Sequence, residues 1–165
     1  MDNSNDNSEF IELLLKEDIE QFNKKRLEKL TTKPNLSNKD FSGRNLSYAF
    51  LNGSICIDTN FSRCNLNKTN FVQAELNQSN FENANLRYCL FMYATMKKCN
   101  LKNTNMEKTN FMWTDLEKAD LTGSKLHDTI FIESNLQESN VKNLRKDKAY
   151  LKFARIENTD WSETN

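Results

Sequence analysis

The only histidine of this chain, His127, is followed directly by Asp128, and these two residue types could share a proton in acid–base catalysis. Both fall at outward-facing positions of the repeat described below, where neighbouring side chains need not point toward each other. The sequence contains no glycine-rich phosphate loop and no nucleophile elbow that could complete a catalytic site. We therefore predict that His127 is an ordinary surface residue and that the protein is not an enzyme.

Four cysteines are the other reactive side chains. None of them belongs to a CxxC pair, and their spacing is not typical of zinc ligands. They are Cys56, Cys64, Cys89 and Cys99. We expect reduced thiols that pack in the interior of a cytoplasmic protein, and we expect no metal and no cofactor.

Basic residues gather near the C-terminus, where they could contact phosphate groups. Asp147 interrupts this group and Glu157 follows it, so a solvated end is the simpler interpretation. Its members are Arg145, Lys146, Lys148, Lys152 and Arg155. The whole chain balances 23 basic against 23 acidic residues, which removes the bulk attraction to nucleic acid or to an anionic membrane. We expect neither of these partners.

The elements that hold these side chains follow from a repeat of five residues. An apolar residue occupies 25 of the 26 positions of this phase from Leu36 to Trp161, and only Lys146 departs from it. Ala, Ser, Thr or Cys lies two residues before this apolar centre in 22 of the 26 units, usually with Asn or Asp between the two. A period of five suits neither an α-helix nor a β-strand. Each unit must therefore turn the chain by a fixed angle, with Asn or Asp tolerating the turn and bonding to local backbone.

A chain that coils in this way needs only a narrow core. Its composition agrees, because 37% hydrophobic residues and a mean hydropathy of -0.80 are too polar for an ordinary two-layer domain of this size. A filled axis also leaves no pocket, so we expect no small-molecule substrate.

Units such as Ala84-Asn85-Leu86 and Ala119-Asp120-Leu121 resemble the A-(D/N)-L-x-x consensus of the pentapeptide-repeat family. The resemblance implies an all-β solenoid, a right-handed quadrilateral β-helix with four units in each of about six coils. Phenylalanines recur at ten-residue spacing, so four sides would give two stacks that face each other across the axis. These stacks are Phe41, Phe61 and Phe81 on one side, and Phe71, Phe91, Phe111 and Phe131 on the opposite side.

The ends of the chain are expected to differ from the repeat. We predict a disordered N-terminus over residues 1–8, a capping helix and linker over 9–33, the β-helix over 34–161 and a C-terminal tail over 162–165. The helix would cover the open first coil. Leu144 and Lys146 exchange the small and large roles, which predicts a bulge on that coil. No signal peptide and no apolar stretch of membrane-spanning length is expected.

One side of the predicted coil carries outward-facing apolar residues, whereas Asn and Asp ladders line the other sides. This candidate interface comprises Val72, Met92, Tyr93, Met112, Trp113, Ile132 and Phe153, with Phe50, Leu90, Ile130 and Tyr150 on the preceding corner. Soluble proteins seldom leave such a patch bare. It would be covered by the N-terminal helix, by a second copy of the chain in a homodimer, or by a different protein partner.

Two functions fit these observations. The first is a non-enzymatic scaffold or protein-interaction module that uses the apolar side. The alternative, which the family resemblance implies, is a DNA-mimicking modulator of DNA gyrase or topoisomerase. A mimic of DNA phosphates needs a strongly negative surface, yet residues 36–100 contain seven basic and four acidic residues. This balance favours the interaction module.

Overall fold

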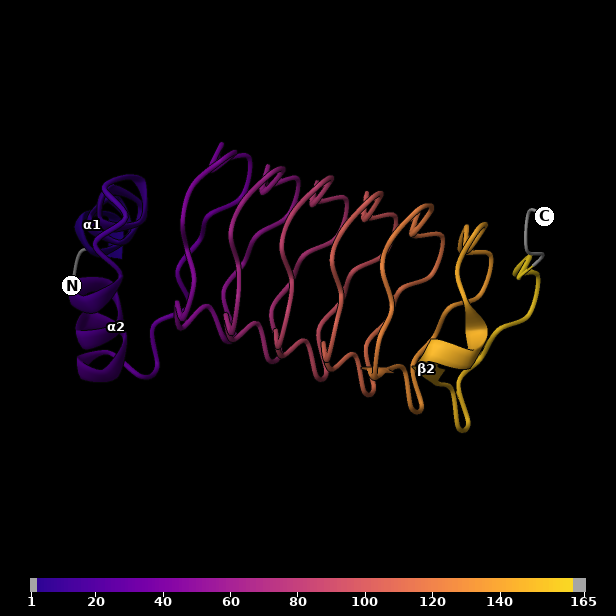
Figure 1. The fold of residues 1–165 in the computed structure, drawn as a ribbon. Coiled ribbons are helices and arrows are strands. Elements are labelled where there is room, and N and C mark those ends of the chain that lie inside the picture. The colour runs from indigo at the N-terminus through magenta and orange to yellow at the C-terminus, as the bar shows by residue number, and fades with distance from the viewer. Residues whose placement is uncertain (1–2, 162–165) are drawn as a thin grey trace.

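The computed structural model describes residues 3–161 as a straight rod of stacked coils that carries two helices at its N-terminal end (Figure 1). The helices are α1 (Asn3–Leu15) and α2 (Ile19–Glu28). Within the coils, β1 (Thr129–Ile130) pairs in parallel with β2 (Ala149–Tyr150), and a 3-10 turn, η1 (Lys146–Lys148), precedes β2.

Each coil contains four sides of five residues. Parallel backbone bridges join residues that are twenty apart, once on each side, as in Asp40 with Asn60 and Asn45 with Asn65. Because a side contributes a single bridging residue, few segments are long enough to count as strands. The bridges confirm the predicted quadrilateral β-helix, and they align the predicted Asn and Asp ladders, in which the Asn65 amide donates to Asn45 Oδ1 at 3.0 Å.

Each corner is a tight turn from one apolar centre to the next small residue. The N–H of Lys39, for example, donates to the carbonyl of Leu36, and Asn38 between them has a φ of 60°. The Asn or Asp before a centre bonds to local backbone as predicted, since Asn35 Oδ1 accepts from the N–H of Ser37. The left-handed conformation itself lies elsewhere, on the second residue after each centre, as a turn with positive φ at its third position requires.

The core is a column of phenylalanine rings, as predicted. Phe71 and Phe91 stack with ring centroids 5.0 Å apart, and Phe61 and Phe81 stack at 5.2 Å on the opposite side. Across the axis, the rings of Phe71 and Phe81 meet edge to face at 6.0 Å. The rings are completely buried, so the axis contains no channel.

The N-terminal segment departs from its prediction in two ways. Residues 3–8 are helical rather than disordered, and two helices stand where we predicted a single one. Glu17 takes a left-handed φ of 58°, and the Asp18 side chain accepts from the N–H of Gln21 to cap α2. The break folds α2 back along α1, so that Phe10 of α1 and Phe22 of α2 meet edge to face at 5.6 Å and are both buried.

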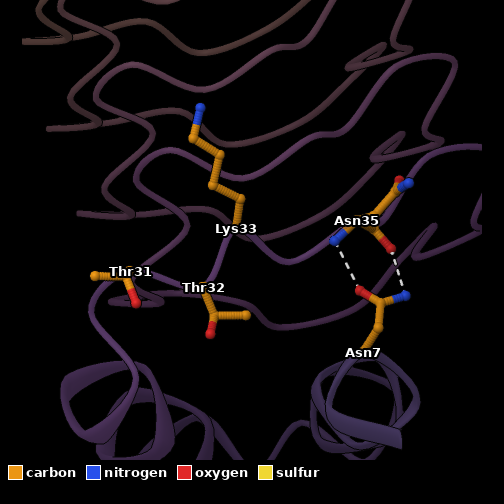
Figure 2. Close-up of a pocket in the computed structure, with 5 residues that line it drawn as sticks. All are labelled: Asn7, Thr31, Thr32, Lys33 and Asn35. Atoms are coloured by element: carbon orange, nitrogen blue, oxygen red, sulfur yellow. Dashed lines mark hydrogen bonds between the residues drawn. The ribbon is translucent and has the colours of Figure 1, made fainter. Parts of the chain in front are cut away.

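The helix pair covers the end of the rod and supplies hydrogen bonds to the first coil in place of those that a preceding coil would form. The Asn7 amide pairs with the backbone of Asn35, donating to its carbonyl at 2.9 Å and accepting from its N–H at 2.7 Å (Figure 2). Asn23 does the same on another side, where it donates to the carbonyl of Tyr48 and accepts from the N–H of Phe50. The helices therefore cap the first coil and do not cover the apolar side, which rules out one of the three predicted occupants.

The side chain of Arg26 completes this cap. It is 5% exposed, and its guanidinium donates to the carbonyls of Thr32, Phe50 and Asn52. Three backbone acceptors at the edge of the first coil are thus satisfied without a further strand.

The predicted irregularity near the C-terminus is present. Leu144 is buried at a position where other units have a small residue, and Lys146 is exposed at the start of η1. The predicted tail over 162–165 lies outside the described residues.

Candidate protein-interaction site

His127 and Asp128 are adjacent in sequence but are not hydrogen-bonded to each other. His127 Nε2 lies 3.8 Å from the Asp128 carboxylate, which is too far for a hydrogen bond, and both side chains are largely exposed. Asp128 instead accepts from the Tyr150 hydroxyl at 3.3 Å. They border a shallow hollow of about 140 Å³ at the bulge. The prediction that His127 is a surface residue is confirmed.

The cysteines are structural. All four are buried and free, and the thiol of Cys89 donates to the carbonyl of Leu66 at 2.8 Å. Thr69 uses its hydroxyl in the same way toward Leu46, so threonine and cysteine share one role at the small position. Burial raises the pKa of Cys64 and of Cys99 to about 12. At neutral pH these thiols are protonated, which makes them poor nucleophiles, and no three His, Cys, Asp or Glu residues within 3–161 are placed to hold a metal ion.

Two members of the basic group near the C-terminus share one carboxylate. The guanidinium of Arg145 forms two hydrogen bonds with the Asp147 carboxylate, at 3.1 and 2.9 Å, and these bonds lower the pKa of Asp147. Lys148 lies 3.4 Å from the same carboxylate. The geometry matches a solvated end rather than a phosphate site.

The seven candidate interface residues lie along one side of the rod, and we call them the apolar strip. Four of them follow their buried centres directly and are half-buried. They are Val72, Met92, Met112 and Ile132. The other three lie one residue further, on the left-handed corner, where Tyr93 is 54% exposed, Trp113 is 40% exposed and Phe153 is 73% exposed.

Backbone hydrogen bonds fix the register of this corner. The N–H of Tyr93 donates to the carbonyl of Met112 at 3.3 Å, and the N–H of Trp113 donates to that of Ile132 at 3.2 Å. The same bond recurs in the preceding and following coils, so that one residue of each coil lies on a single line along the rod. We call this line the corner ladder; it consists of Gly53, Gln73, Tyr93, Trp113, Glu133 and Phe153.

The rings of Tyr93 and Trp113 lie at the middle of the corner ladder. They stack with centroids 4.7 Å apart and planes 11° apart. Stacking holds both rings in one orientation before any partner arrives, which lowers the entropy lost when such side chains are immobilised in an interface.

The structure adds a hollow that the sequence did not predict. Leu27 and Leu30 of the α2 segment are 59% and 76% exposed, and they lie beside Phe50 at the N-terminal end of the apolar strip. With Arg26, Asn52 and Asn70 these three residues line a hollow of about 240 Å³, which we call the end hollow.

A second ladder of aromatic residues on another corner was also missed. Lys68 lies 5.2 Å from the ring centre of Tyr48 and 5.9 Å from that of Tyr88, and Lys108 lies 5.6 Å from Tyr88. The residues alternate at intervals of twenty, which is the signal that could have revealed them. Because the lysines and tyrosines already form cation–π contacts with one another, this corner is less available for binding a partner than the apolar strip.

Neither helix within residues 3–161 is long and apolar enough to cross a membrane. A search of curated proteins found no match. Among solved structures, the fold is similar to HetL, a pentapeptide repeat protein involved in heterocyst differentiation regulation from the cyanobacterium Nostoc sp. strain PCC 7120. The identity is 24%, the TM-score is 0.70, and the match covers 74% of this chain. It covers 54% of HetL, so the chain spans about half the length of that relative.

Rfr23, a pentapeptide repeat protein from the cyanobacterium Cyanothece 51142, is similar over 86% of this chain and 99% of its own, at 19% identity and a TM-score of 0.62. Full-length QnrB1, a plasmid-mediated fluoroquinolone resistance protein, has 18% identity over 75% of this chain and 82% of its own; its TM-score of 0.36 is too low to support a shared function. The family model for pentapeptide repeats matches residues 54–91, 74–107 and 109–143, which is more than half of the chain. The protein therefore belongs to the pentapeptide-repeat family, and its coil is the right-handed quadrilateral β-helix of that family.

Proposed function

We propose that this protein is a non-enzymatic, cytoplasmic interaction module that binds protein through its apolar strip. The observation that supports this proposal is the exposure of Tyr93, Trp113 and Phe153 on one line of the rod. Tyr, Trp and Met are enriched at protein interfaces. A continuous apolar surface of this kind is costly to leave in water.

The rest of the fold gives the apolar strip no other role. The core is already filled by the phenylalanine column, so the strip is not needed to stabilise the coils. The helices α1 and α2 are engaged at the end of the rod through Asn7, Asn23 and Arg26. The strip therefore remains available along the length of the rod.

Surface charge disfavours the alternative function, a DNA-mimicking modulator of gyrase or topoisomerase. A mimic must present unneutralised carboxylates in place of phosphates. Here Lys97 lies 3.0 Å from Asp115 and 2.8 Å from Glu117, and Arg87 lies 3.0 Å from Glu107. These three acidic side chains are thus paired with bases on neighbouring coils.

The proposal can be tested with a photoreactive phenylalanine analogue placed at either Tyr93 or Tyr48. Both tyrosines are 54% exposed, and both occupy left-handed corners with φ of 61° and 65°, so Tyr48 is a matched control on a different corner. Irradiation in cells should give a discrete protein adduct from position 93 that is absent from position 48. Adding Met112→Glu should abolish the adduct. No adduct at position 93, or the same adduct at both positions, would overturn the proposal.

A further inference from the structure

The apolar strip lies on two ladders whose middle residues are similar when the ladders are read in either direction. The residues directly after the centres run Asn52, Val72, Met92, Met112, Ile132 and Lys152. Reversing this order exchanges Asn with Lys, Val with Ile, and Met with Met. The corner ladder behaves alike, because reversal exchanges Gly with Phe, Gln with Glu, and Tyr with Trp. The similar residues are Met92 and Met112, Val72 and Ile132, and Tyr93 and Trp113, and the centre of both ladders lies between the coil of Tyr93 and the coil of Trp113.

We propose that the occupant of the apolar strip is a second copy of this chain, packed face to face and antiparallel. The inference rests on the proposed function, since it names the partner of the same surface. A two-fold axis at the centre of the two ladders makes such an interface isologous, so that each residue meets the residue at the same distance from the centre in the other half of the second copy. Met92 then packs on Met112 of the second copy, and the stacked pair of Tyr93 and Trp113 meets the same pair reversed.

The two ends of the apolar strip complement each other in shape. Phe153 projects from one end and is 73% exposed. The two-fold places it opposite Gly53, which has no side chain and lies at the same distance on the other side of the centre. Beside Gly53 is the end hollow, lined by Leu27, Leu30 and Phe50. The ring of Phe153 and the end hollow lie at matching distances from the two-fold axis. The ring of one copy can therefore pack into the hollow of the other.

The polar residues of the apolar side also favour the antiparallel arrangement. The axis sets Glu133 opposite Gln73, whose amide can donate to the carboxylate, and sets Lys152 opposite Asn52. A parallel pairing of the same faces would place Glu133 against Glu133 and Phe153 against Phe153, which opposes like charges and leaves the hollow empty. The chain has a net charge of zero, so two copies do not repel each other overall.

Cysteine cross-linking tests the arrangement directly. Three single variants are made: Gln73→Cys, Glu133→Cys and, as a control on another corner of the same coil, Gln78→Cys. Positions 73 and 78 both carry an exposed Gln with a positive φ, of 59° and 64°. The four native thiols are buried, so a short bis-maleimide reacts only with the introduced cysteine. We expect a cross-linked dimer when Gln73→Cys and Glu133→Cys are mixed, but not with either variant alone.

Each other outcome overturns the inference. Self-cross-linking of each variant alone would indicate a parallel pair, and equal cross-linking of Gln78→Cys with Glu133→Cys would indicate random collision. No cross-link in any mixture would mean that a second copy does not occupy the apolar strip. In that case the photo-adduct at position 93 still decides the proposed function, because it reports any protein partner. Phe153→Ala should weaken dimerisation about tenfold or more, as expected for an aromatic anchor, and Tyr48→Ala should leave it unchanged.

Discussion

Tyr93 and Trp113 are separated by one turn of the coil in sequence, and their rings stack at a centroid distance of 4.7 Å on the outside of the protein. Both take a left-handed backbone conformation that costs a residue with a side chain about 1 to 2 kcal/mol. The same conformation recurs on the second residue after other centres, so what distinguishes this corner is that it holds two large rings in solvent. This arrangement is expected of a binding surface and not of a residue that packs the core.

The hydroxyl at the small position should matter only where a preceding coil exists. Ser79 Oγ donates to the carbonyl of Cys56, whereas within residues 3–161 Ser54 Oγ has no partner. We predict that Ser79→Ala lowers the free energy of unfolding by about 1 kcal/mol and that Ser54→Ala leaves it unchanged or raises it. Urea unfolding of both variants gives the comparison. Equal losses would show that these hydroxyls act through packing and not through hydrogen bonds.

The helix pair should stabilise the rod by closing its first β edge. Asn23→Ala removes the bonds to Tyr48 and Phe50 and leaves both backbone groups unpaired, so we predict a loss of about 1 to 3 kcal/mol. The neighbouring Lys24→Ala is the control, because Lys24 is exposed. Amide hydrogen exchange should accelerate at Phe50 in the first variant alone. Unchanged exchange at Phe50 would contradict the capping role.

The buried thiols should make the protein less stable in alkali. Burial raises the pKa of Cys64 and of Cys99 from 9.0 to about 12. The unfolded chain therefore releases these protons first, and the free energy of unfolding falls as pH rises from about 9 toward 12. Between pH 8 and pH 10 the loss should be about 1 kcal/mol for each buried thiol.

Urea midpoints at the two pH values test this dependence. The double variant Cys64→Ser and Cys99→Ser serves as the control, because serine does not titrate in this range and can donate the same hydrogen bonds to Phe41 and Leu76. Its midpoint should fall less than that of the wild type. Equal falls would show that other groups govern the alkaline range.

The repeat predicts the coil because each apolar centre can be buried only in the axis of the coil. A five-residue period that buries one large residue per side fixes both the number of sides and the stacking of Phe61 on Phe81. The prediction of one N-terminal helix was wrong for a local reason, since Asp18 is a strong helix cap and the sequence shows no glycine or proline to mark the break. The hydrogen bond between Asn23 and Phe50 joins residues that come together only when α2 packs on the first coil, so no local sequence pattern predicts it.

The same distinction applies to the candidate site. The apolar strip was predicted because its members share one phase of the twenty-residue coil, which is a property of sequence spacing. The end hollow was not, because Leu27 and Leu30 meet Phe50 only after α2 turns back. The proposed position of Gly53 opposite Phe153 in the dimer could not be inferred either, because it requires knowing the coil in which each residue lies.

The central claim is that the apolar strip joins two copies of the chain. Sedimentation equilibrium should be measured over a wide concentration range for the wild type and for the variant with Met92→Glu, Met112→Glu and Trp113→Glu. A matched control carries three glutamates at the same positions of another side, as Ile57→Glu, Asn77→Glu and Gln78→Glu. Urea unfolding establishes that all three proteins are folded.

We expect a concentration-dependent dimer for the wild type and for the control variant, and a folded monomer at every concentration for the strip variant. A wild type that stays monomeric throughout, or a strip variant that dimerises as well as the wild type, would contradict it.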